Sequence, residues 1–298
     1  MISGINQTEK TNTHVSEPVN NEKKQKKDGK LREGLSIFAA LGSTGAINSI
    51  YNSSIAVKLD NNLKKIEAQS SQYNNMLSSA GYLAFYNSGL KTKGVKMPAL
   101  DIIQDIYNCE VSKIPFKGIF QRKKQKKICN SIKRVLDGTG ALYKVNEKHI
   151  LVNMDRLPAA SFHEMGHALN YNSVGIGKLL AKLRPIGGLA NLFLAVAVLR
   201  KPKAEGEESE TRIGRGLDFI KKNCTTLSAL SLLPLVLEEG LASIKGIKLA
   251  KGLLNEPAMK SMKRVCGAGW LTYFGAAVSS VLAVYAADKV RNKTAQKG

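Results

Sequence analysis

The sequence predicts a mainly α-helical fold in which one small antiparallel β-hairpin lies beside a helix with the pattern His-Glu-x-x-His. Three observations support this prediction. Residues 61–90 place apolar side chains at helical spacing, residues 141–153 alternate like two short strands, and residues 163–167 hold two histidines four positions apart, on one face of a helix. Apolar runs of helical length follow, so we also expect membrane-associated helices.

The composition separates two classes of partner. The chain has 298 residues and a formal net charge of +22. Such charge is compatible with nucleic-acid binding, but aromatic residues make up only 6 % and no recognisable nucleic-acid motif occurs. The basic residues instead adjoin long apolar runs, which suits anionic lipid headgroups. We therefore expect membrane lipids, and no nucleic acid, as partners.

The cysteines point to a reducing compartment. The chain has four of them and no C-x-x-C pair: Cys109, Cys129, Cys224 and Cys266. This scatter predicts free thiols rather than a disulfide framework or a zinc knuckle.

The first third of the chain contains two predicted regions. Residues 1–34 are polar and basic and predict a disordered tail. Residues 35–95 predict an N-terminal helical region, and its first run, 35–59, carries Ser, Thr and Asn throughout. We expect that run to be a membrane-associated or core helix rather than a spanning one. Residues 99–111 predict a further helix. The basic stretch 117–134 is either a solvated surface or a contact with the cytoplasmic leaflet, with a nucleic-acid patch as the third alternative.

The predicted hairpin comes directly before the His-Glu-x-x-His helix. Its strands cover residues 141–145 and 149–153, and an edge strand at this place could pair with an extended peptide. His149 is a possible extra metal ligand, although its strand position favours a surface or packing role. Asp155 as N-cap and Pro158 in the first turn are typical of a helix start.

The helix that follows carries the candidate chemistry. His163 and His167 can offer two imidazole nitrogens to one metal ion, with Glu164 beside them as a carboxylate that accepts a proton from water. Asn170 lies one turn beyond His167 and is a candidate to support the ligands. Gly166 is a poor helix former, so we expect a neighbouring strand or a substrate to approach closely there.

Three apolar runs follow. Residues 179–199 and 217–237 have uncharged cores shorter than the roughly 20 residues of a straight span, so they predict either a short membrane hairpin or buried helices. Residues 265–287 carry no charge and predict a transmembrane helix, with 288–298 as a tail. If the first two runs span, the excess of Lys and Arg places the His-Glu-x-x-His segment on the cytoplasmic side.

A third metal ligand is expected downstream, because a catalytic zinc usually keeps three protein ligands and one open position. Glu238 and Glu239 end an apolar run, where a carboxylate is costly unless it is paired or bound to a metal. A solvated helix end remains the alternative. Ala242 and Ser243, on the next turn, are small enough for this helix to press against the His helix.

These motifs together resemble a known family. The His163-Glu-Met-Gly-His167 segment, the paired apolar runs and the element Leu-Pro-x-x-x-Glu-Glu-x-x-Ala-Ser are similar to the neutral zinc metallopeptidases of bacterial membranes, the YugP-like group. The resemblance covers about residues 153–250 and implies a zincin-like catalytic domain of the gluzincin type. We predict this domain at residues 96–264, with an apolar helical hairpin at about 179–237. The resemblance also implies membrane attachment, peptide-bond hydrolysis, and Glu239 as third zinc ligand with Glu238 in reserve.

We therefore expect a membrane-bound zinc metallopeptidase, single-pass or multi-pass, that acts on a peptide or protein substrate. His163, His167 and Glu239 would bind Zn²⁺, and Glu164 would be the general base. A site-2-type intramembrane protease is disfavoured because its Asn-Pro-Asp element is missing. The alternative is a non-enzymatic membrane scaffold whose metal motif is incidental or structural.

Overall fold

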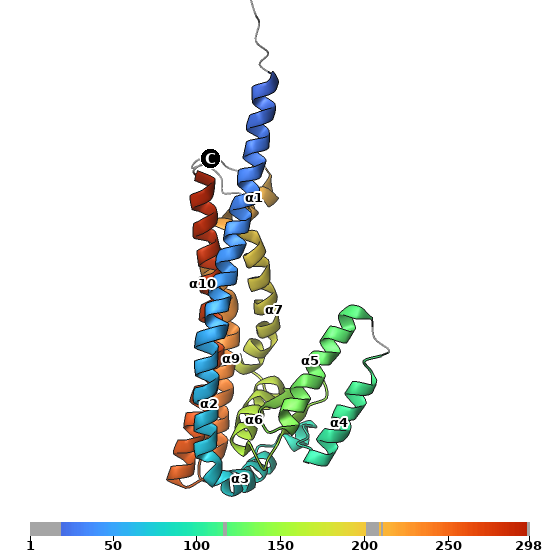
Figure 1. Ribbon diagram of the computed structural model, residues 1–298. Helices are drawn as coiled ribbons and strands as arrows, with labels where there is room; N and C mark the ends of the chain where they lie inside the picture. The colour runs from blue at the N-terminus through green and yellow to red at the C-terminus, as the bar shows by residue number, and fades with distance from the viewer. Residues whose placement is uncertain (1–18, 116–117, 201–208, 210, 297–298) are drawn as a thin grey trace, which may run out of the picture.

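The computed structural model describes residues 19–115, 118–200, 209 and 211–296. Figure 1 shows a long helical bundle with a helical arm beside its lower end. The helices are α1 (Val19–Ile50), α2 (Ala56–Ser70), α3 (Asn74–Asn87), α4 (Leu100–Ser112), α5 (Ile119–Leu136), α6 (Pro158–Asn172), α7 (Ile176–Ala197), α8 (Arg212–Lys222), α9 (Cys224–Ala250) and α10 (Glu256–Gln296), with short turns η1 (Tyr51–Ile55), η2 (Ser71–Tyr73) and η3 (Lys91–Lys93). Strands β1 (Ala141–Lys144) and β2 (His149–Val152) form an antiparallel pair. The predicted helical fold with one small hairpin is confirmed, while its likeness to zincins stays a prediction.

Among the described residues, three helices are long and apolar enough to cross a membrane: α7, α9 and residues 256–293 of α10. They run along the bundle together with α1 and α2 (Figure 1). At most 33 % of the most apolar window of each helix is buried, so most of its residues keep some contact with the surroundings, as helices next to lipid do. The predicted span 265–287 is the middle of α10. The predicted run 217–237 is divided between two helices, since residues 217–222 end α8 and residues 224–237 begin α9. Helix α9 continues to Ala250, which gives it a length that the uncharged core alone lacked.

Two segments predicted as tails are helical where the structure describes them. Residues 19–34 begin α1 and residues 288–296 end α10; residues 1–18 and 297–298 lie outside the described part. The reason is pairing between the polar ends of the two helices. Arg291 is 1 % exposed and lies 3.1 Å from a carboxylate oxygen of Glu33. The predicted boundary at residue 264 likewise falls inside α10 rather than between two domains.

The arm consists of α4 and α5, and it is attached to the bundle through the hairpin. Ile103 of α4, Ile132 and Val135 of α5 and Leu151 of β2 form one buried apolar cluster. The free edge of β2 is partly covered, because Lys96 exchanges backbone hydrogen bonds with the residues on either side of His149. This strand edge is therefore not open to an added peptide at that position.

Candidate metal centre

Helix α6 is the buried element that carries the site. It begins with Pro158 at its first turn, and its N-cap residue is Leu157, so the predicted cap at Asp155 is wrong. The turn before the helix is held instead by Asn153, whose side-chain oxygen accepts the backbone N–H groups of Asp155 and Arg156. Phe162, which directly precedes His163, is fully buried in the main core. Local turn chemistry therefore fixes where the histidine helix starts.

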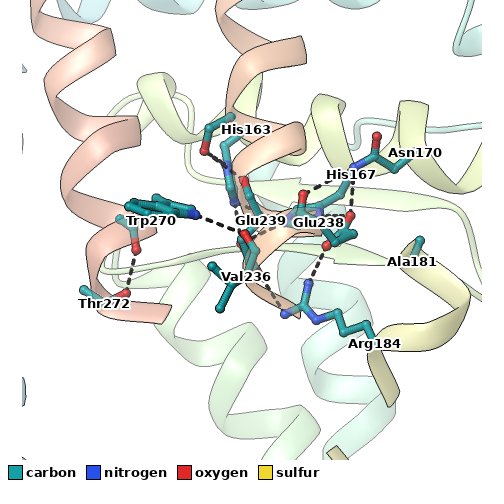
Figure 2. Close-up of polar contacts among 12 residues, drawn as sticks. His163, His167, Asn170, Ala181, Arg184, Val236, Glu238, Glu239, Trp270 and Thr272 are labelled. Atoms are coloured by element: carbon teal, nitrogen blue, oxygen red, sulfur yellow. Dashed lines mark hydrogen bonds and ion pairs between the residues drawn. The ribbon is translucent and has the colours of Figure 1, made fainter. Parts of the chain in front are cut away.

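Helices α6 and α9 approach so closely that only glycine fits at two contacts. A Cβ atom on Gly166 would overlap the backbone carbonyl of Ala242, and one on Gly246 would overlap the carbonyl of Phe162. The close neighbour of Gly166 is thus a helix, and the expectation of a strand or a substrate at that point is wrong. This spacing lets short carboxylate side chains of α9 reach the imidazoles of α6 (Figure 2).

Three donor atoms converge at the meeting point of these helices. His163 Nε2 lies 3.0 Å from His167 Nε2 and 3.1 Å from Glu239 Oε2, and His167 Nε2 lies 3.4 Å from the same oxygen. Tetrahedral zinc with bonds of about 2.0–2.1 Å places its ligand atoms about 3.3 Å apart. The three atoms therefore form one face of a tetrahedron of the size that Zn²⁺ requires. One carboxylate oxygen of Glu164 lies within 4.8 Å of a nitrogen of each histidine.

The opposite ring nitrogens have partners that determine which nitrogen is free for a metal. The hydroxyl of Ser243 donates to the backbone carbonyl of Glu239 at 3.1 Å, so its oxygen can accept the Nδ1–H of His163 at 3.0 Å. Glu238 accepts the Nδ1–H of His167 at 2.8 Å. When both rings are neutral, each histidine presents its Nε2 lone pair to the centre, the arrangement that hydrogen-bonded metal-ligating histidines adopt.

Glu238 contacts the far ring nitrogen of His167, and together with His167 and Glu239 it forms the second group of possible metal ligands. Its Oε1 also accepts a hydrogen bond of 2.9 Å from the amide of Asn170. Both carboxylates are fully buried, so the alternative of a solvated helix end is wrong. Asn170 supports the site through Glu238, in the supporting position predicted for it.

Arg184 of α7 is the member of the site that the sequence analysis missed. Its Nη1 donates a hydrogen bond of 2.9 Å to Glu238 Oε2 (Figure 2). Its Nη2 forms an ion pair of 2.6 Å with Glu239 Oε1, in which the geometry is not that of a hydrogen bond. The guanidinium also lies 5.7 Å from the centre of the Tyr273 ring in α10. A signal was present in the sequence, since Arg184 interrupts an apolar run next to Pro185.

The charges of this cluster favour a divalent cation. Glu164, Glu238 and Glu239 carry three negative charges when ionised, against the single positive charge of Arg184. With neutral histidines the formal charge is minus two, which a divalent cation would cancel. A buried cluster of that charge is costly without a counter-ion, so the donor set fits Zn²⁺ in charge as well as in geometry.

In the metal-free protein, a proton on His167 cancels part of this negative charge. Burial alone would lower the pKa of His167, but its hydrogen bonds with Glu238 and Glu239 outweigh burial and raise the pKa to about 10. His167 is then an imidazolium at neutral pH in the metal-free protein. A metal ion therefore has to displace a proton from this ring.

The structure brings together His163, Glu164, His167 and Glu239, and it places Glu238 and Asn170 directly behind them. His149 lies outside the two groups of possible metal ligands among the described residues. No family model, curated protein or solved structure matches this chain.

Proposed function

We propose that this protein is a membrane-bound, zinc-dependent metallopeptidase with His163, His167 and Glu239 as the zinc ligands. The single observation that carries the proposal is the convergence of three donor atoms 3.0–3.4 Å apart on one side, with the opposite ring nitrogens already satisfied. A helical pair of histidines is common, and the buried carboxylate of Glu239, which is aimed at both Nε2 atoms in addition to its ion pair with Arg184, supplies the third donor that a catalytic zinc uses.

Each residue then has a defined task in hydrolysis. Zinc, when bound, would supply Lewis acidity that lowers the pKa of a water molecule to about 7. Glu164, which is 8 % exposed, accepts the proton of that water as it attacks the scissile carbonyl, and it donates the proton to the leaving amine. Ser243 and Glu238 keep the imidazoles in the required tautomer, and Arg184 holds Glu239 so that only Oε2 faces the histidines.

The membrane part of the proposal rests on the helices that build the site. Arg184 belongs to α7, and both glutamates belong to α9, which are two of the three candidate spans. Glu238 and Glu239 lie near the middle of α9 and Arg184 lies in the first half of α7, so the ligand cluster borders the candidate spans directly. The excess of Lys and Arg between residues 245 and 264 favours the cytoplasmic side for that end of α9.

The test uses the full chain purified in detergent, as wild type and with Glu164→Gln. Zinc is measured by plasma mass spectrometry, and turnover is measured on a randomised peptide library with mass-spectrometric detection of new termini. We expect about one zinc per chain in both proteins, and turnover that is about 10²–10⁴-fold slower in the variant because the general base is lost. Glu256→Gln, an exposed carboxylate at the start of α10, is the matched control and keeps full turnover.

Two results would count against the proposal. Wild-type protein that binds no zinc would remove the metal centre. Equal behaviour of wild type and Glu164→Gln would favour the scaffold, in which the same cluster only joins α6 to α9.

A further inference from the structure

Helix α5 presents a continuous positive surface that the proposed metal centre does not use. The helix contains no acidic residue, and seven of its cationic side chains are exposed: Arg122, Lys123, Lys124, Lys126, Lys127, Lys133 and Arg134. Buried Gln125 and Ile132 hold the opposite face of the helix against α4 and the hairpin. The five lysines therefore belong to an outer surface, while Arg122 and Arg134 donate hydrogen bonds to the backbone carbonyls of Pro115 and Thr139.

The tip of the arm is apolar where the cations begin. Phe120, in the first turn of α5, is 88 % exposed, and Val111 near the end of α4 is 37 % exposed. Segments that bind at the membrane interface often carry a large aromatic side chain next to a group of lysines. The ring enters the headgroup region and the ammonium groups remain at the phosphates.

The position of the arm also supports a membrane as its partner. Figure 1 shows the arm projecting beside the bundle, with its tip directed away from α3 and level with part of α7. Helix α7 exposes apolar side chains along its length, among them Leu189, Leu192 and Val196, which are 61–70 % exposed. A bilayer that covers α7 would lie on the side toward which the tip of the arm points.

We propose that the α4–α5 arm is a second membrane anchor, with Phe120 inserted into an anionic leaflet and the α5 cations on its phosphates. Anionic lipid attracts such a surface within a screening distance of about 8 Å, which a helix lying at the headgroups satisfies. The anchor does not depend on the metal centre. Since Leu151 of β2 packs in the core of the arm, the anchor holds the hairpin that precedes α6 next to the membrane.

Fluorescence quenching in nanodiscs tests this proposal. The native Trp270 is replaced by Phe to remove its signal, and a tryptophan is introduced by Phe120→Trp; circular dichroism checks that the helices are retained. The discs contain bromine-labelled lipid, either with phosphatidylglycerol or with phosphatidylcholine alone. Leu100→Trp is the matched control, because Leu100 is 38 % exposed at the opposite end of α4, about 18 Å along that helix from its last turn.

We expect bromine to quench the tryptophan at position 120 about twofold in anionic discs, and to leave the tryptophan at position 100 unchanged. Replacing Lys123, Lys124 and Lys127 by Gln should reduce quenching at position 120 to the value found in phosphatidylcholine alone. Emission at position 120 that is unquenched in both discs overturns the proposal. So does emission that responds to added RNA and not to lipid, which would assign the cations to nucleic acid.

Discussion

Two regions of this molecule carry dense charge and arrange it in opposite ways. At the α6–α9 contact, Glu238 and Glu239 are fully buried, and each contacts a histidine and Arg184. On α5 the cationic side chains are exposed on a helix without a single carboxylate. One region therefore has its geometry set by pairing, and the other carries its charge on the exposed surface of one helix.

The difference follows from solvation. A carboxylate removed from water is costly unless hydrogen bonds and opposite charges replace the solvent, so a buried cluster is stable only in a few geometries. Exposed lysines keep their hydration, and they contribute little to folding wherever they point. Dense buried charge is thus a sign of a site with fixed geometry, whereas dense exposed charge is a sign of a contact surface. The following substitutions test this contrast, from the largest expected effect to the smallest.

Removal of one ligand should have the largest effect. His163→Ala takes away one of three converging donors, so we expect zinc affinity to fall by more than the 10–100-fold that loss of a supporting partner costs. Competition with a chromophoric chelator measures the change. His149→Ala is the control, and equal loss in both variants would contradict the assignment of His163.

Adding a methyl group at the α6–α9 contact should have the second-largest effect. Gly166→Ala forces α6 away from the carbonyl of Ala242, and we expect a loss of about 3 kcal/mol of stability together with weaker zinc binding. Thermal unfolding in detergent measures it. At Gly188, inside α7, a Cβ atom meets nothing within 4 Å, so Gly188→Ala should leave stability equal or about 1 kcal/mol higher. Similar melting of the two variants would show that the helices can separate without cost.

Loss of the Arg184 guanidinium should have a smaller effect. Arg184→Gln frees Glu239 Oε1 and leaves Glu238 with less compensation, so we expect zinc affinity to fall about 10–100-fold. Arg184→Lys keeps the charge but cannot contact both carboxylates with one planar group, and it should recover only part of the affinity. Full recovery by lysine would mean that charge alone, and not the forked geometry, positions Glu239.

Charge removal on the arm should have the smallest effect on folding. Replacing Lys123, Lys124 and Lys127 by Gln should change the free energy of unfolding by no more than about 0.5 kcal/mol in detergent, because these side chains are exposed. Thermal unfolding checks this value. A destabilisation as large as that of Gly166→Ala would show that the α5 cations are part of the fold.

The helices that carry the ligands could be predicted because their signals are local. The four-residue spacing of His163 and His167 places both rings on one face of any helix, whatever packs around it. The apolar length of residues 265–287 likewise predicts a helix able to cross a membrane. The ends of α1 and α10 could not be predicted, since their polar residues are held by a contact between Glu33 and Arg291, 258 positions apart.

The sequence by itself determined which residue types could hold a cation and that they lie on helices, because residue chemistry and helical period are local properties. Only the tertiary structure decided how they are arranged. It put Glu239 at the two Nε2 atoms and Glu238 behind His167, and it brought in Arg184 from another helix. Adjacent glutamates point about 100° apart on a helix, so the packing of α9 on α6 through Gly166 and Gly246 selects which one faces the histidines.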